Sequence, residues 1–163
     1  ATGVYDALSA LGARPAGLFA QSAMRIEKKF LAYGHELDTD VSPLSAGLGF
    51  AVDWDKDFIG KAALEAQKAD GFESRMVSIV LDDVNAVPLG NEPVLFDGKI
   101  VGKTTSAAFG YRINAPVALA DIQEASARVE NAVVNINIAG ELFPARVRRG
   151  PVFDPKGARM RQG

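Results

Sequence analysis

Three stretches in the first half of the chain place apolar residues every three or four positions, a spacing that predicts amphipathic helices. They are residues 3–13, 19–33 and 58–70. Gly34 directly follows the second stretch and suits the left-handed conformation that commonly ends a helix. Between the second and third helices, residues 45–58 predict a glycine-rich apolar strand that ends in an acidic turn.

From Arg75 onward the apolar period shortens to that of β-strands. The strand-like runs are SRMVSIVL, EPVLF, KIVGKTTSAAF, APVALADI, AVVNINI and LFPARVR. Asp97-Gly98 and Ala139-Gly140 separate neighbouring runs and predict tight hairpin turns. We therefore expect an α+β fold, in which a helix-rich α/β half (residues 1–72) is followed by a small antiparallel β barrel or sandwich of about six strands (residues 73–163).

The predicted helix at residues 19–33 carries a carboxylate within its apolar face. At 100° per residue, that face is centred on Phe19, Ala23, Ile26, Phe30 and Tyr33. Glu27 lies inside it, where an unpaired carboxylate is costly. Glu27 either fixes a neighbouring loop or arginine, or it orients a ligand. Arg25 lies outside the face, as a solvated group or as a ligand contact.

An acidic segment, GHELDTDVSP, follows this helix. Its carboxylates, Glu36, Asp38 and Asp40, alternate with other residues, but the central glycine and final glutamate of a calcium-binding loop are missing. We therefore predict a solvated turn and no metal site. His35 is most simply explained as a loop residue.

Composition excludes several classes of function. The chain has 163 residues, 48% of them apolar, and a net charge of −2, which gives no basic field for nucleic acid or membrane lipid. It has no cysteine and one histidine, which excludes thiolate chemistry and multi-histidine metal sites. No signal-peptide pattern and no apolar run of about 20 residues occurs. We expect a soluble protein of the cytoplasm, or of the mitochondrial matrix in a eukaryote.

The stretch MRIEKKFLAYGHELDTDVSPLSAGLGFAVDWDKDFIGKAAL resembles a characteristic segment of the aminomethyltransferase family, which includes the glycine cleavage T-protein. NEPVLFDGKIVGKTTS is similar to that family's barrel hairpin, and LFPARV with FDPKGARMR to its ending. Within the family, DWDKDFIGK and FDPKGARMR look most like the folate-binding C-terminal region of dimethylglycine and sarcosine dehydrogenases. The resemblance covers nearly the whole chain.

This resemblance implies a tetrahydrofolate-dependent one-carbon transfer protein with a C-terminal β barrel. In the family, a three-domain ring encloses folate, which captures a methylene group from an amine substrate. The catalytic aspartate lies in the preceding half, so no catalytic residue is assigned here. We expect a C-terminal portion that is inactive alone, with an incomplete folate site and an N-terminal half as partner. FAD is expected only if a flavin domain lies upstream.

Carried over residue by residue, the resemblance makes Arg25 and Tyr33 folate-binding residues and Glu27 an orienting residue. Two features depart from the family pattern. Ser45 stands where an acidic residue is usual. Where the family commonly has glycines and a lysine after Thr105-Ser106, this chain has Ala107-Ala108 and Asn114-Ala115-Pro116. Two other functions stay open: a folate-dependent demethylase of the same superfamily, and a non-catalytic interaction module.

Overall fold

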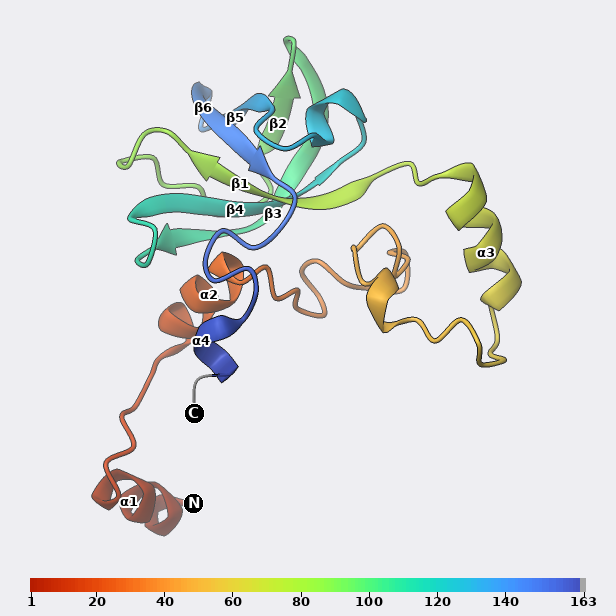
Figure 1. Cartoon of the computed structure of the whole chain (residues 1–163). Coiled ribbons are helices and arrows are strands. Elements are labelled where there is room, and N and C mark those ends of the chain that lie inside the picture. The colour runs from red at the N-terminus through yellow and green to blue at the C-terminus, as the bar shows by residue number, and fades with distance from the viewer. Residues whose placement is uncertain (162–163) are drawn as a thin grey trace.

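The computed structural model describes residues 1–161 as a β barrel with α2 and α4 below it, α3 to its right and α1 apart from it in the view of Figure 1. The helices are α1 (Thr2–Ala10), α2 (Leu18–Glu27), α3 (Lys61–Asp70) and α4 (Ala158–Arg161), with short 3-10 turns η1 (Gly49–Ala51) and η2 (Ser126–Arg128). The strands are β1 (Arg75–Leu81), β2 (Pro93–Phe96), β3 (Lys99–Gly110), β4 (Ala115–Ile122), β5 (Val133–Ile138) and β6 (Glu141–Arg148).

The strands form a closed antiparallel barrel in the order β1-β4-β3-β2-β5-β6. The predicted α+β class and the barrel of about six strands are thus confirmed, and the sandwich alternative is wrong. Alternate side chains fill the interior, because successive residues of a strand point to opposite faces. This core includes Val77, Ile79, Leu81, Val94, Ile122, Val134, Ile136 and Val147.

Both predicted hairpin turns are present. Asp97 and Gly98 join β2 to β3 with φ values of 49° and 75°. Ala139 and Gly140 join β5 to β6 with φ values of 52° and 93°. Two consecutive positive φ values define the tight turn whose twist matches that of the flanking strands. These turns fix the register of two strand pairs.

Helix α2 packs on the outside of the barrel against β3 and β4. Ile26 is buried there in a second apolar cluster with Met76, Val117 and Leu119. Strand β4 therefore has an apolar core on both faces, which explains why its sequence, APVALADI, is almost continuously apolar. The contact holds α2 in place beside the part of β3 around Thr105, where the pairing with β4 shifts register.

The predicted helix at residues 19–33 is too long, because α2 ends at Glu27. Lys29 takes a left-handed conformation with φ of 53°. The Phe30 N–H then donates to the Arg25 carbonyl oxygen at 2.8 Å, and the Lys29 N–H to that of Ile26 at 3.0 Å, as in a Schellman C-cap. Tyr33 consequently lies in a turn and not on the apolar face of a helix.

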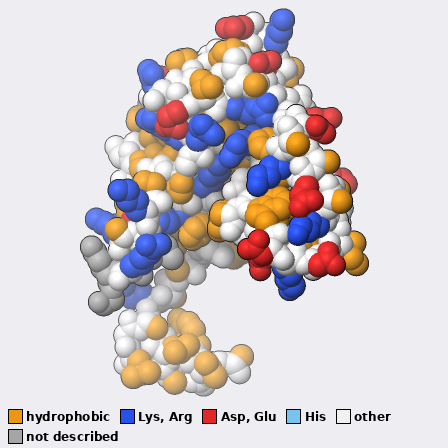
Figure 2. All heavy atoms as spheres, turned by 45° about the vertical axis from the view of Figure 1, so that its right-hand side comes forward, with side chains coloured by type: hydrophobic (Ala, Val, Ile, Leu, Met, Phe, Trp, Pro, Cys, Tyr) orange, Lys and Arg blue, Asp and Glu red, His pale blue; other side chains and the backbone are white. Residues whose placement is uncertain are grey.

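The remaining first-half elements are poorly buried. Helices α1 and α3 have no buried residue, and α3 begins at Lys61, later than predicted. Figure 2 shows α1 as a separate body with many apolar side chains on its surface. The strand predicted at residues 45–58 is wrong: they form turns and η1, and their one backbone bond to a strand that the structure describes is from the Met76 N–H of β1 to the Ser45 carbonyl oxygen, at 3.0 Å. Within residues 1–161, no helix is long and apolar enough to cross a membrane.

Candidate functional site

The candidate site is built on a β-bulge in β3. The pairing of β3 with β4 shifts register between Thr104 and Ser106, which leaves Thr105 as the extra residue. The Thr104 hydroxyl bonds to Glu92, whereas those of Thr105 and Ser106 both bond to groups outside the barrel. A regular strand would point two consecutive side chains in opposite directions. The bulge therefore supplies two neighbouring hydroxyl groups to one site.

Arg25 and Glu36 form a buried ion pair over this bulge. Arg25 Nη1 lies 2.8 Å from Glu36 Oε2, and Arg25 Nη2 donates to Ser106 Oγ at 2.8 Å. The other oxygen, Glu36 Oε1, accepts from Thr105 Oγ1 at 2.9 Å. The Ala32 N–H also donates to Glu36 Oε2, at 3.0 Å. Both carboxylate oxygens of Glu36 are thereby satisfied, as a buried charge requires.

The surroundings of Glu36 favour its ionised form. Burial is the strongest single influence on its pKa and raises it. The Ser106 hydroxyl, the Ala32 N–H, the Arg25 charge and the Thr105 hydroxyl act in the other direction. Together they outweigh burial and hold the pKa of Glu36 below its ordinary value. Glu36 is therefore a fixed negative charge, only 2% exposed, and not part of a solvated turn as its sequence pattern predicted.

Tyr33 lies in the turn that carries Glu36. The Ala32 carbonyl accepts from the N–H groups of His35, Glu36 and Leu37, and Tyr33 forms an isolated bridge with Leu37. The Tyr33 side chain is 77% exposed. Its ring and hydroxyl are thus open to a ligand or partner, while Arg25 is largely enclosed, with a side chain that is 17% exposed.

Glu27 links three parts of the chain. Its buried carboxylate accepts from the backbone N–H groups of Arg112, at 2.8 Å, and Ile113, at 3.3 Å, in the β3–β4 connection. Its carbonyl oxygen accepts from Val152 and Phe153, both at 3.1 Å. The structure thus brings Arg25 together with the bulge but points the Glu27 carboxylate at a separate loop.

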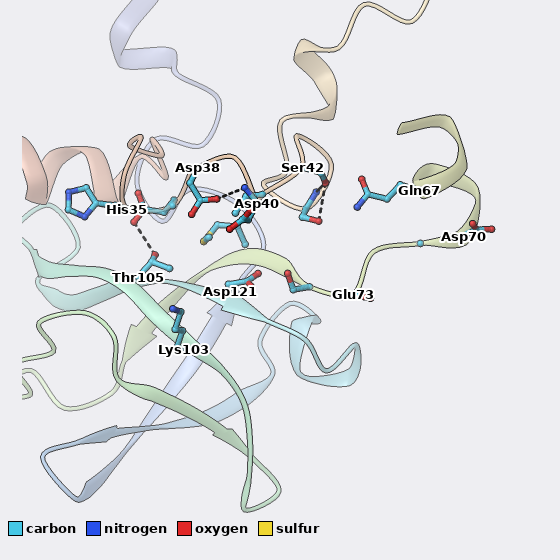
Figure 3. Close-up of a pocket in the computed structure, with 16 residues that line it drawn as sticks. His35, Asp38, Asp40, Ser42, Gln67, Asp70, Glu73, Lys103, Thr105 and Asp121 are labelled. Carbon is cyan, nitrogen blue, oxygen red and sulfur yellow. Dashed lines mark hydrogen bonds between the residues drawn. The ribbon is translucent and has the colours of Figure 1, made fainter. Parts of the chain in front are cut away.

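A cavity of about 510 Å³ opens beside the bulge (Figure 3). Lys103 and Thr105 of β3 and Asp121 of β4 form its barrel side, the loop with Asp38, Asp40 and Ser42 faces them, and Gln67 and Asp70 of α3 close one end. His35, Glu36, Ser45 and Glu73 also line it. Carboxylates outnumber cations in this lining. In the part of the chain that the structure describes, no three His, Cys, Asp or Glu residues are grouped to hold a metal ion.

Sequence reasoning missed Glu36, Thr105 and Ser106. Glu36 has the same spacing and polar neighbours as Asp38 and Asp40, so periodicity could not separate a buried carboxylate from exposed ones. The one available signal was indirect, since an arginine enclosed beside an apolar helix face needs an acidic partner.

Comparisons with known proteins define the family. Residues 75–154 match the model of the glycine cleavage T-protein C-terminal barrel domain, and residues 1–56 match that of the GCVT N-terminal domain. The fold is similar to that of glycine cleavage system aminomethyltransferase T from Bartonella henselae, with a TM-score of 0.75 and 23% identity over 83% of this chain and 38% of that one.

The longer relatives include both aminomethyltransferases and amine-oxidising enzymes, the two branches that the sequence suggested. Mitochondrial dimethylglycine dehydrogenase of Homo sapiens is 35% identical over 97% of this chain and 19% of its own length. An aminomethyltransferase of Nostoc is 37% identical over 92% and 39%. The formaldehyde-forming 4-methylaminobutanoate oxidase of Paenarthrobacter nicotinovorans is 35% identical over 97% and 19%. The chain belongs to the aminomethyltransferase, or glycine cleavage T-protein, family and spans less than half the length of these relatives.

Proposed function

We propose that this chain contributes one wall of a tetrahydrofolate site in a one-carbon transfer protein, and that the reacting aspartate is supplied by the family's N-terminal half. Family membership supports the cofactor class, and the enclosed Arg25 beside an exposed Tyr33 supports the placement of the wall. Residues 1–72 would form the folate-facing part and residues 73–163 the supporting barrel. Alone, the chain would be inactive.

Arg25 retains the capacity to contact such a ligand. A guanidinium has five N–H donors. Nη1 uses its two in bonds to Glu36 and the Phe30 carbonyl, and Nη2 uses one on Ser106. The Nε donor and the second Nη2 donor are left to bind a ring acceptor or carboxylate of folate. Glu36 and Ser106 would hold the guanidinium plane so that these donors keep one direction.

Tyr33 and Glu27 would have different roles. The exposed Tyr33 ring offers an aromatic face against which the flat rings of folate can stack. Glu27 would act at a distance by ordering the connection at Arg112 and Ile113. When bound, tetrahydrofolate supplies the nitrogen that captures an amine-bound methylene group, and the residues of this chain only bind and orient it.

Calorimetric titration with tetrahydrofolate tests this proposal. The experiment compares the isolated chain with the longer polypeptide that joins it to an N-terminal half of the family. We expect saturable binding only to the longer protein, and a loss of at least about tenfold in affinity for Arg25→Lys or Tyr33→Ala, since each removes a contact of about 1.4 kcal/mol or more.

Glu65→Gln, an exposed change on α3 outside the cavity lining, is the matched control and should leave the affinity unchanged. Unchanged affinity in both the Arg25 and Tyr33 variants would show that this wall does not face the folate. Tight binding to the isolated chain would contradict a shared site.

The branch of the family is a separate question. Identities of 35% to the dehydrogenase and the oxidase and of 37% to the transferase do not distinguish them. We propose the amine-oxidising branch, because DWDKDFIGK and the FDPKGARMR ending resemble it. The visible absorption spectrum of the longer polypeptide checks this. We expect the yellow colour of a bound flavin, and a colourless protein would favour the free-standing transferases.

A further inference from the structure

Three arginines from distant parts of the chain line a second pocket, of about 370 Å³. Arg75 begins β1, Arg128 ends η2, and Arg149 directly follows β6. Phe72 and Val129 add apolar walls. Gly71 lines both this pocket and the acidic cavity, so the two lie on either side of the connection between α3 and β1. Figure 2 shows Lys and Arg side chains gathered in a band between two lobes of the molecular surface.

Local contacts hold these arginines in place. The Arg75 guanidinium carbon lies 5.4 Å from the centre of the Phe72 ring. Arg128 Nη1 donates to the Phe72 carbonyl oxygen at 3.3 Å. Phe72 thus holds two guanidinium groups: its ring holds that of Arg75, and its carbonyl oxygen holds that of Arg128.

The third arginine is held by its backbone. The Arg149 N–H donates to Glu130 Oε2 at 2.8 Å, and its carbonyl oxygen accepts from Lys29 Nζ at 2.8 Å. Because these bonds use only main-chain atoms, the guanidinium of Arg149 is left to turn toward a ligand. The Arg75 and Arg128 side chains are therefore already ordered, and only that of Arg149 is not. This lowers the side-chain entropy that binding an anion would cost.

In the described part of the chain, no close ion pair neutralises the three guanidinium groups, although the charges of Glu124, near Arg128, and of Glu130, near Arg149, offset part of their positive charge. Among residues 1–161, no carboxylate oxygen lies within 4.0 Å of a side-chain nitrogen of Arg75, Arg128 or Arg149, and the ion pairs are elsewhere. The neighbouring Lys29 also feels two of these arginine charges. Its burial first, and then the charges of Arg75 and Arg149, lower the pKa of Lys29 to about 8. Burial is thus the largest cause of this shift, and the two arginine charges add to it.

We propose that this arginine pocket binds a small, multiply charged oxyanion group, either a phosphate or a pair of carboxylates. Planar guanidinium groups donate two parallel hydrogen bonds to such oxygens, which a single ammonium group cannot do. Three arginines lining one pocket match an ion with more than one negative charge, and the volume admits a compact ligand. The inference is independent of the folate proposal, because it uses none of the residues around Arg25.

Isothermal titration of the full chain with pyrophosphate and, separately, with citrate distinguishes the two sources of oxyanion. We expect saturable binding of at least one of them that weakens as sodium chloride is added. Arg149→Gln is the decisive variant. The hydrogen bonds that residue 149 makes to Glu130 and Lys29 use its backbone, so the substitution should leave the fold intact. It should weaken binding about tenfold, the equivalent of one charge-assisted contact.

Arg146→Gln is the matched control. Arg146 is also a barrel arginine with an exposed side chain, but it pairs with Asp82 and lies outside the pocket lining. An equal loss of affinity in both variants would reduce the effect to general charge attraction and overturn the proposal. Absence of saturable binding for both anions would overturn it as well.

A second readout does not depend on a variant. A bound anion would stabilise the protonated form of Lys29, so NMR titration of its side chain should show a pKa above 8 in the presence of the anion that binds. An unchanged value at saturation would place the anion elsewhere. This measurement also covers the case in which Arg75 or Arg128 cannot be replaced without unfolding the chain.

Discussion

Arg25 and Glu36 lie eleven residues apart in the chain and meet at 2.8 Å over a bulge in β3. The side chain of Glu36 is completely enclosed, and that of Arg25 is nearly so. Helix α2 supplies the cation, the turn after it supplies the carboxylate, and the barrel supplies the hydroxyl groups of Thr105 and Ser106. The pair thus joins the helical half of the chain to the barrel.

Replacement of Glu36 by alanine should reduce the free energy of unfolding by about 3 kcal/mol, since it leaves Arg25 enclosed without its counter-ion. Urea denaturation followed by circular dichroism measures this change. Asp57→Ala, at an exposed position, is the control and should change stability by less than about 0.5 kcal/mol. Similar losses of unfolding free energy in the two variants would mean that the buried ion pair does not stabilise the fold.

Gly102 lies where β3 and β4 approach closely. A Cβ atom at this position would lie 2.0 Å from the Asp121 carbonyl oxygen, in the backbone of the paired strand. Gly102→Ala should therefore destabilise the barrel by about 3 kcal/mol or more. Gly150→Ala is the matched control, because a Cβ there meets no atom within 4 Å and its φ is not left-handed. Thermal unfolding of both variants tests the difference, and equal melting temperatures would contradict it.

Glu27→Ala should loosen the β3–β4 connection, because the N–H groups of Arg112 and Ile113 lose their acceptor. Hydrogen exchange should accelerate at these two amides, and the unfolding free energy should fall by about 2 kcal/mol. Glu27→Gln keeps one acceptor oxygen and should show a smaller change. Glu65→Ala, on the exposed α3, is the control. Unchanged exchange at residues 112 and 113 would remove the orienting role proposed for Glu27.

The titration of Lys29 should make the free energy of unfolding rise with pH in mild alkali. The folded-state pKa of Lys29, about 8, lies below the ordinary 10.5, so between these values the unfolded chain binds more protons and stability rises with pH. A neutral amine still has two N–H donors for the carbonyl oxygens of Met76 and Arg149. From about pH 8 to about pH 9.5 the gain should reach about 2 kcal/mol.

The measurement compares urea unfolding of the natural chain and of Lys29→Met at both pH values. The gain should be present in the natural chain and absent from Lys29→Met, which has no group that titrates at this position. Lys156→Met, at an exposed position, should keep the gain. If the natural chain and Lys29→Met respond equally to pH, another group is responsible.

The strands were predictable because their period of two and the Asp97-Gly98 turn are local signals. The end of α2 was not, because apolar spacing continues through Phe30 and Tyr33, and the residue that takes the left-handed conformation is Lys29 and not a glycine. A cap of this kind is decided by contacts made after the chain has folded.

The site was predictable only in part for the same reason. Arg25 stands out from the helix pattern, but its partner Glu36 is selected by the bulge at Thr105, which no local spacing reveals. The arginine pocket is less visible still, since its members come from three segments separated by most of the barrel. Long-range placement, and not residue type, distinguishes these groups from other charges in the chain.

Closure of the barrel also limits when this half of the molecule can fold. Strand β1 pairs on one side with β4 and on the other with β6, for example through Ile79 and Val147. The ring therefore closes only after residues 141–148 have left the ribosome, and the pairing of such distant segments is intrinsically slow. During synthesis one side of β1 stays unpaired until β6 is complete, and an unpaired strand edge is open to wrong pairing and chaperone capture.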